Sequence, residues 1–342
     1  MKKQRIEYFD AAKGIAIIAV IVGHMGLIAR GMTLTERFIF SFHMPIFFLI
    51  SGYFLSSRMT LWEFAKKRFK QLIFPYIFTW GIMCAWSVCE DFVMKRPDLI
   101  ANLKMWILAG MFGAGSDHND VMSRYQIHQI GAIWFLLALF VALLITRFFI
   151  QYRYGYIGIL VIAIIGYYSS KYIWFPWSIQ PGMVACIFVY LGWLCKSKKI
   201  LSIRCKKEIF VLLCAVWYIS IIFSRGLYMV NNAYENGILD IAGALAGSYV
   251  IIIICMFLCK YSSGIKKILL FYGKNSLIVL CFHLVELNMF PWGMVYGYII
   301  SHGMSDAEYF VIQIVGKMLW VTAGIMIVRR FALTRKIFCI ES

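Results

Sequence analysis

Apolar stretches separated by short polar gaps recur along the whole 342-residue chain. A helix needs about 20 apolar residues to cross a hydrocarbon core of about 30 Å, so each stretch predicts one membrane-spanning helix. The pattern predicts an all-α, polytopic integral membrane protein with about ten transmembrane helices and no separate soluble domain. The predicted spans are residues 11–29, 38–55, 72–88, 130–150, 156–168, 179–195, 209–223, 238–259, 276–290 and 309–328.

The composition leads to the same fold class. Hydrophobic residues make up 62% of the chain and charged residues 15%, which is more apolar side chain than one soluble core can bury. The net charge of +18 comes from Lys and Arg in the gaps, without a basic face, so no nucleic-acid partner is expected. With the N-terminus inside, inner gaps carry about three times as many basic residues as outer ones. This bias predicts a multi-pass protein of the cell (inner or cytoplasmic) membrane with both termini cytoplasmic.

Residues 5–330 are assigned to one membrane domain, and residues 1–4 and 331–342 to short cytoplasmic tails. The N-terminus is similar to the first part of a signal peptide, but no small-residue cleavage site follows, so the first helix is expected to be retained. The ten cysteines include no CxxC pair and lie mostly in apolar stretches. They are expected to pack as small hydrophobic side chains.

The longest polar-containing gap, residues 89–129, is predicted to form an outer loop. Long loops in compact proteins are often functional or disordered. The tip of this loop could bind a metal ion, but a solvated tip is the favoured interpretation and no metal site is expected. The polar residues of the tip are Asp117, His118, Asn119 and Asp120.

Two ionisable residues, Lys13 and His24, lie within the first predicted span. Eleven residues at 100° each return to within about 20° of the starting helix face, so both side chains share one stripe. They lie about 16 Å apart along the axis, with Lys13 nearer the cytoplasm. Ionisable residues within a span are functional candidates by default. The alternative is that His24 only makes a hydrogen bond between helices.

The second span carries His43 at its outer end, followed by Pro45 and a small Ser51-Gly52 pair. Proline removes a backbone donor and leaves a carbonyl in need of another partner, so a broken helix that lines a cavity is expected. Two imidazoles on neighbouring helices can act as general base and helper, since histidine titrates near neutrality. Alternatively, His43 is an interfacial residue without a role.

His283 and Glu286 lie three residues apart in the ninth span and therefore share one helix face. The carboxylate either fixes the tautomer of the imidazole or forms a structural clamp between helices. The chain has no nucleophile elbow, Walker loop, HExxH motif or Rossmann fingerprint. Serine-hydrolase, ATPase and zinc-protease functions therefore lack support.

Residues 8–24, 41–53, 66–76, 134–136 and 273–283 together resemble the acyltransferase family 3, in particular its branch of fucose O-acetylase-like proteins. This family comprises polytopic bacterial enzymes similar to the O-acetyltransferases of surface polysaccharides. The resemblance extends from residue 5 to about residue 328, and its first two segments are the most specific. It implies that acyl groups pass from cytoplasmic acetyl-CoA to acceptors at the outer face of the membrane.

The resemblance also implies roles for individual residues. His24 aligns with the essential first-span histidine, as general base or transient acyl carrier, with His43 as its helper. Lys13 stands where many members have Arg, and it keeps the charge but not the bidentate fork. Lys13, Lys67 and Arg68 are expected to bind the anionic acyl-CoA, although basic loop residues also serve topology. Supporting roles are expected for Asp10, Ser51, Trp134, Asn275, Ser276, His283 and Glu286.

The predicted function is therefore a membrane O-acyltransferase that uses acyl-CoA as a co-substrate and has no tightly bound cofactor. Its partners are the carbohydrate acceptor and the lipid bilayer. A second possibility is a transporter or flippase whose intramembrane His and Lys line a substrate path. That class favours two related halves, and no internal repeat is visible. A sensory or scaffold protein is a third possibility, which leaves the shared face of Lys13 and His24 unexplained.

Overall fold

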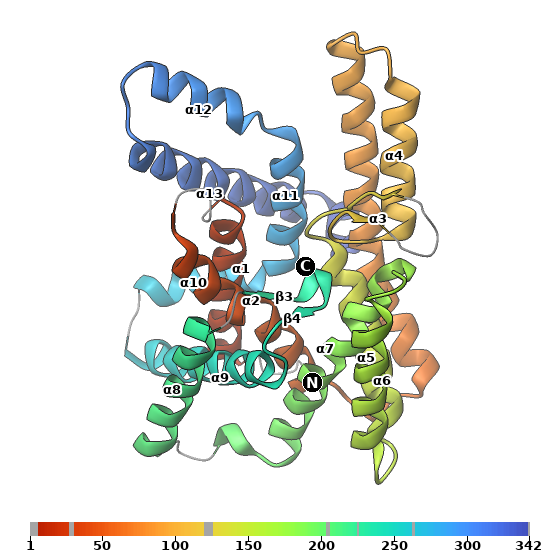
Figure 1. Cartoon of the computed structure of the whole chain (residues 1–342), viewed down its shortest axis with the longest axis vertical. Helices are drawn as coiled ribbons and strands as arrows, with labels where there is room; N and C mark the ends of the chain where they lie inside the picture. The colour runs from red at the N-terminus through yellow and green to blue at the C-terminus, as the bar shows by residue number, and fades with distance from the viewer. Residues whose placement is uncertain are drawn as a thin grey trace. The chain divides into compact units, whose positions relative to one another are not determined.

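The computed structural model describes residues 6–26, 31–119, 126–202, 206–223, 226–261 and 264–340. The predicted N-terminal tail, residues 1–4, and Asp120 of the predicted loop tip lie outside these ranges. The described residues fold almost entirely into α-helices, which confirms the predicted all-α class (Figure 1).

The described helices follow one another with short connections and two small hairpins. The α-helices are α1 (Glu7–Gly23), α2 (Thr33–Tyr53), α3 (Leu61–Val93), α4 (Leu99–Phe112), α5 (Trp134–Phe149), α6 (Gly155–Ser169), α7 (Ile179–Ser197), α8 (Lys207–Phe223), α9 (Ile238–Tyr261), α10 (Gly264–Lys274), α11 (Ser276–Met289), α12 (Trp292–Ser301), α13 (Asp306–Arg330) and α14 (Ala332–Ile337). The 3-10 helices are η1 (Pro176–Ser178), η2 (Ile200–Ser202) and η3 (Met229–Asn231). Strand β1 (His118–Asn119) pairs antiparallel with β2 (Gln126–Ile127), and β3 (Leu227–Tyr228) with β4 (Ala233–Tyr234).

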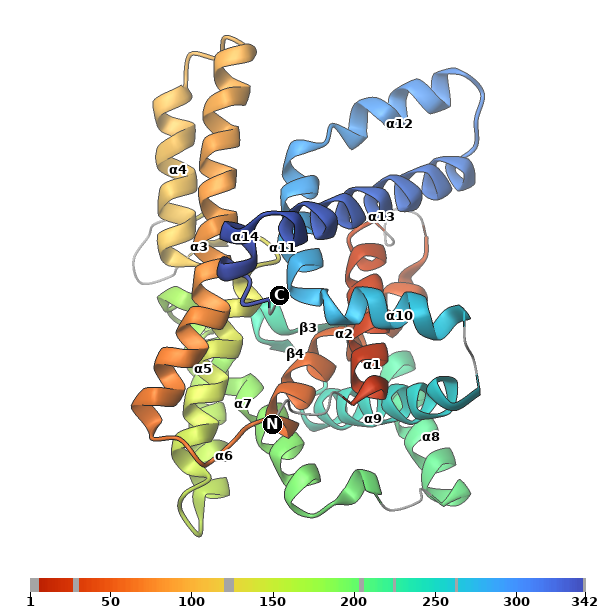
Figure 2. The same cartoon turned by 180° about the vertical axis from the view of Figure 1, so that it is seen from behind.

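The chain divides into two compact units, and the first comprises Met1–Ala65, Ala138–Lys171 and Ile179–Ser276. Within this unit α1 packs against α10, and α2 packs against α7 (Figures 1 and 2). The hairpin of β3 and β4 lies between α8 and α9 in the chain and packs its first strand on α2. This unit therefore contains both predicted catalytic histidines, His24 and His43.

Glycines allow these two helix pairs to approach backbone to backbone. A Cβ atom at Gly52 of α2 would collide with a backbone carbonyl of α7, and one at Gly192 of α7 with a carbonyl of α2. Gly14 of α1 and Gly273 of α10 make the same reciprocal contact. Close packing of this kind at small residues is typical of helices in lipid, where association depends on van der Waals contact.

The second unit comprises Lys66–Leu137, Tyr172–Ser178 and Leu277–Ser342. Its helices α3 and α4 form an antiparallel pair (Figures 1 and 2). The Tyr76 hydroxyl of α3 donates a hydrogen bond of 2.6 Å to the carbonyl of Gly110 in α4. Helices α11 and α13 of the same unit are joined by polar contacts that are described with the site below.

Each of the ten predicted spans overlaps one of the helices. Among the described residues, five segments are long and apolar enough to cross a membrane, and a sixth if the bent pair of α10 and α11 counts as one broken span. The five are α2, α3, η1 with α7, α9 and α13. Five other predicted spans correspond to α1, α5, α6, α8 and α11, which have 17, 16, 15, 17 and 14 residues. The count of ten spans therefore stays a prediction.

The predicted outer loop over residues 89–129 is wrong in its first half. Helix α3 continues to Val93, and α4 follows over Leu99–Phe112. The 14 residues of α4 are strongly apolar but too few for a full span, so a criterion based on span length passes over them. Helices α10 and α12, with 11 and 10 residues, are also shorter than a span and were missed, and α14 lies within the predicted C-terminal tail.

Helix α2 runs through Pro45, from Thr33 to Tyr53, so the proline does not end the helix and a kink at this residue stays a prediction. Because α2 begins before the predicted span, His43 lies in the middle of the helix and not at its outer end.

Replacement of Gly52 by Val tests the backbone contact between α2 and α7. We expect the variant to lose about 2 kcal/mol or more of unfolding free energy, because neither backbone can move away from the added side chain. Thermal unfolding of the purified protein in detergent measures this loss. Gly81→Ala in α3 is the control, because its new Cβ meets no atom within 4 Å. A Gly52→Val variant as stable as the parent would contradict the packing.

Candidate functional site

Lys13 lies in α1 beside a buried carboxylate. Its ammonium forms an ion pair of 2.7 Å with Asp10 Oδ1, one turn earlier on the same helix. The Lys13 side chain is about a quarter exposed, whereas Asp10 is buried. An ammonium has three N–H donors, so the pair with Asp10 leaves donors of Lys13 for a second anion.

The segment around Gly273 packs directly on this part of α1. A Cβ atom at Gly273 would collide with the carbonyl of Asp10 and the amide of Gly14. Asn275 then ends α10 by donating a hydrogen bond of 2.7 Å to the carbonyl of Phe271, and Ser276 begins α11. The segment around Gly273 and the segment around Lys13 are therefore in contact, although about 260 residues separate them in the sequence.

His24 follows the last residue of α1, so the expectation that it lies inside a longer span is wrong. The helix ends at Gly23, and the chain turns at Gly26, whose φ of +69° favours glycine. The imidazole Nδ1 lies 2.7 Å from the carbonyl oxygen of Val20. Because a carbonyl only accepts, Nδ1 carries the proton and Nε2 carries the lone pair.

His43 has the same local geometry inside α2. Its Nδ1 donates a hydrogen bond of 2.8 Å to the carbonyl of Ile39, and the residue is 3% exposed. The ring of Phe40 lies 4.8 Å from the His43 ring and 6.4 Å from the His24 ring, measured between centroids. The first two helices therefore bring both predicted catalytic histidines to one phenylalanine, each with its basic atom at Nε2.

A third polar group, missed by the sequence analysis, lies on the same face of α2. Glu36, Phe40 and His43 occupy positions i, i+4 and i+7. Glu36 is 8% exposed, and its Oε1 accepts a hydrogen bond of 3.0 Å from the hydroxyl of Tyr228. The Tyr228 ring packs on Phe40 with centroids 5.2 Å apart. The helical spacing from His43 was a usable signal, but the predicted span began only at residue 38.

Tyr228 belongs to strand β3, and its environment favours the neutral phenol. Burial and the hydrogen bond to the Glu36 carboxylate raise the pKa of Tyr228 to about 12. Tyr228 therefore keeps its proton at neutral pH and serves as a hydrogen-bond donor to Glu36.

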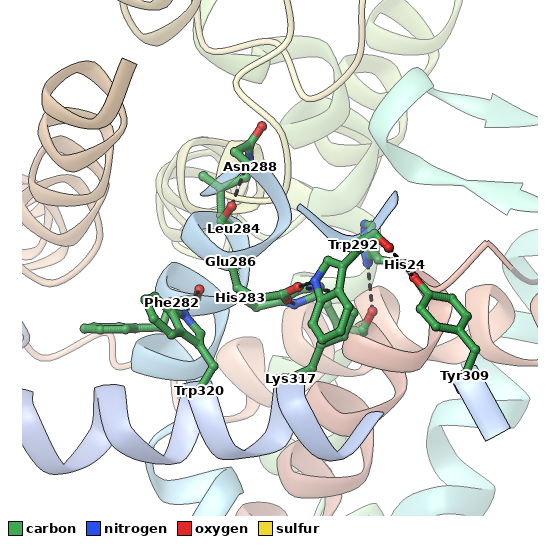
Figure 3. Close-up of polar contacts among 11 residues, drawn as sticks. His24, Phe282, His283, Leu284, Glu286, Asn288, Trp292, Tyr309, Lys317 and Trp320 are labelled. Atoms are coloured by element: carbon green, nitrogen blue, oxygen red, sulfur yellow. Dashed lines mark hydrogen bonds and ion pairs between the residues drawn. The ribbon is translucent and has the colours of Figure 1, made fainter. Parts of the chain in front are cut away.

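A second polar cluster lies in the other unit, between α11 and α13 (Figure 3). His283 Nδ1 lies 3.1 Å from Glu286 Oε2, as the shared helix face predicted. Glu286 Oε1 accepts hydrogen bonds from the ammonium of Lys317, at 2.6 Å, and from the indole of Trp292. Glu286 is 1% exposed and Lys317 is 0% exposed. The carboxylate thus clamps two helices as well as holding the histidine, which combines both interpretations left open by the sequence.

The remaining predicted residues have simpler surroundings. Lys67 is exposed on α3, and Arg68 donates a hydrogen bond of 2.9 Å to Gln71 on the same helix. Both belong to the second unit and Lys13 to the first, so their grouping around one donor stays a prediction. Trp134 is buried against Phe135. Ser51 is half-buried in the last turn of α2.

The predicted polar loop tip is part of a hairpin. His118 stacks on Trp174 with ring centroids 3.9 Å apart, and Asp117 accepts a hydrogen bond from the amide of Gln129. Among the residues that the structure describes, no three His, Cys, Asp or Glu side chains gather to hold a metal ion.

Lys317→Met tests the buried clamp. Removal of the ammonium leaves the Glu286 carboxylate buried without its cation, and we expect a loss of about 3–5 kcal/mol of unfolding free energy. The double variant Lys317→Met/Glu286→Gln removes both charges and is expected to regain a large part of this loss. Thermal unfolding of the three proteins in detergent provides the comparison. Equal stability of the single variant and the parent would rule out the clamp.

Two proteins similar to this chain carry the same name. Nodulation protein NolL of Mesorhizobium japonicum is 28% identical over 149 residues, which cover 41% of this chain and 34% of NolL. Nodulation protein NolL of Sinorhizobium fredii is 30% identical over 156 residues, which cover 42% of this chain and 37% of NolL. The chain therefore spans about a third of the length of these curated relatives. No solved structure matches the chain.

The family comparison covers almost the whole chain. Residues 6–330 match acyltransferase family 3, which is described as an acyltransferase domain. This range includes both histidines on Phe40, the Lys13 region and the clamp of α11 and α13. Together with the long apolar helices, the match indicates a membrane protein. The chain belongs to acyltransferase family 3.

Proposed function

We propose that this chain is a multi-pass O-acetyltransferase of the cell membrane. It transfers an acetyl group from cytoplasmic acetyl-CoA to a hydroxyl of a cell-surface or exported carbohydrate. Family membership supports acyl transfer, and the apolar helices support the membrane location. The observation that carries the proposal is the pair of imidazoles on Phe40, both protonated at Nδ1.

In this proposal His24 acts as the general base. Its Nε2 takes the proton of the acceptor hydroxyl while the hydroxyl oxygen attacks the thioester carbonyl. The carbon–sulfur bond breaks, the thiolate leaves with the proton held on Nε2, and an ester remains on the carbohydrate. The Val20 carbonyl stabilises the imidazolium that forms, because it accepts the hydrogen bond from Nδ1.

His43 supports this chemistry from within α2. It is buried and contacts the same phenylalanine as His24, so it shapes the environment of the base without being as accessible. The alternative route acylates imidazole Nε2 first and then transfers the group to the hydroxyl. Both routes use the same nitrogen of His24.

The donor is proposed to bind on the Lys13 side of α1. Coenzyme A carries phosphate groups, and the ammonium of Lys13 offers a charge-assisted hydrogen bond to them. Asp10 orients that ammonium through its ion pair. Lys67 and Arg68 are proposed to add positive charge at the same cytoplasmic entrance. This arrangement requires a cytoplasmic N-terminus and a cytoplasmic segment between the second and third spans, as the distribution of basic residues predicts.

His24→Gln tests the general base. Glutamine keeps a polar side chain but cannot take up a proton, so we expect transfer to fall about 100-fold or more. The assay measures transfer of radiolabel from acetyl-CoA to surface polysaccharide that has been stripped of its esters by mild alkali. Parent and variant are reconstituted in vesicles at equal amounts.

His302→Gln is the matched control for this assay. His302 follows the last residue of α12, and its Nδ1 donates to the carbonyl of Tyr298 at 2.8 Å, as His24 does to Val20. Loss of this local hydrogen bond alone should leave transfer unchanged. Full transfer by a correctly inserted His24→Gln variant would sink the assignment.

Lys13→Met and Lys13→Arg test the donor side. The Met variant loses the charge, and we expect its KM for acetyl-CoA to rise about 10-fold. The Arg variant keeps the charge and should remain within a few-fold of the parent. The measurement is the dependence of initial rate on acetyl-CoA concentration. A Met variant with the parent's KM would show that Lys13 does not bind the donor.

A further inference from the structure

Glu36 is a buried carboxylate with only one of its oxygens accounted for. Oε1 accepts the hydrogen bond from Tyr228, whereas the buried Oε2 has no hydrogen-bond partner among the described residues. Burial of a carboxyl oxygen without a hydrogen-bond partner costs free energy, so such an oxygen in a native structure calls for an explanation. Such an oxygen is suited to accept a hydrogen bond from a ligand.

The position of Glu36 relates it to the proposed chemistry. It shares one face of α2 with Phe40 and His43, and it lies about 10 Å from His43 along the helix axis. Between them, the half-buried rings of Phe40 and Tyr228 pack together, and the His24 ring also contacts Phe40. The two views place β3, which carries Tyr228, beside α2 (Figures 1 and 2).

These groups match the chemistry of a carbohydrate and not that of the donor. An ionised carboxylate only accepts hydrogen bonds, and hydroxyl groups are its natural neutral donors. Aromatic faces supply apolar surface for the C–H faces of a sugar ring. The phosphates of coenzyme A would be repelled by the same carboxylate.

We propose that Glu36 and Tyr228 bind the acceptor carbohydrate. This inference rests on the proposed function. Oε2 of Glu36 accepts a hydrogen bond from a hydroxyl of the sugar other than the one that is acylated, and Tyr228 holds the carboxylate in place through Oε1. Glu36 thus binds the sugar and fixes it relative to His24 without taking part in bond making, and Tyr228 is the positioning residue that acts through Glu36.

Glu36→Gln separates acceptor binding from donor binding. The amide keeps the shape of the side chain but weakens the hydrogen bond to the sugar, so KM for the alkali-treated polysaccharide should rise about 10- to 100-fold. KM for acetyl-CoA should stay within about twofold of the parent. Tyr228→Phe removes the donor that holds Glu36 and should raise KM for the polysaccharide by a smaller factor. The same radiolabel assay gives all of these constants.

Glu235→Gln is the matched control, because Glu235 is an exposed carboxylate close to Tyr228 in sequence. It should leave both KM values unchanged. An unchanged KM for the polysaccharide in Glu36→Gln, or an equal rise in both KM values, would overturn the acceptor site while leaving the proposed function intact. If the parent protein transfers no label at all, the proposed function fails and this inference fails with it.

Discussion

Several polar side chains in this protein donate a hydrogen bond to the carbonyl oxygen four residues earlier in the chain. In a bilayer no water is available to satisfy such groups, so a partner within the same helix is the one that every span can supply. The bond adds a second donor to a carbonyl that already accepts from the backbone. Examples are His24 to Val20, His43 to Ile39, Thr79 to Pro75, Thr146 to Ala142 and Asn275 to Phe271.

The helices, and those contacts of the site that lie within one helix, could be predicted because they depend on residues close together in the sequence. Hydropathy located ten of the helices, and helical spacing placed His283 and Glu286 on one face, where they interact. Each of these conclusions depends on residues close together in the sequence, for which the helix geometry is known in advance.

The contacts that could not be predicted join residues far apart in the chain. Glu36 and Tyr228 are 192 residues apart, and Glu286 and Lys317 are 31 apart on different helices. Lys317 lies within the predicted span 309–328, but the sequence of that span does not indicate that Glu286 is its partner. The end of α1 was missed for another reason, because it depends on the turn at Gly26 and not on hydropathy.

The tautomer of His24 has a consequence for the path of the proton. Since Nδ1–H is held by the Val20 carbonyl, the ring cannot pass a proton from one nitrogen to the other without breaking its bond to the helix. A proton that arrives at Nε2 must therefore leave from Nε2. In the mechanism that we propose, the imidazole therefore works through one atom only, and the acceptor hydroxyl and the departing thiol would meet the same edge of the ring in turn.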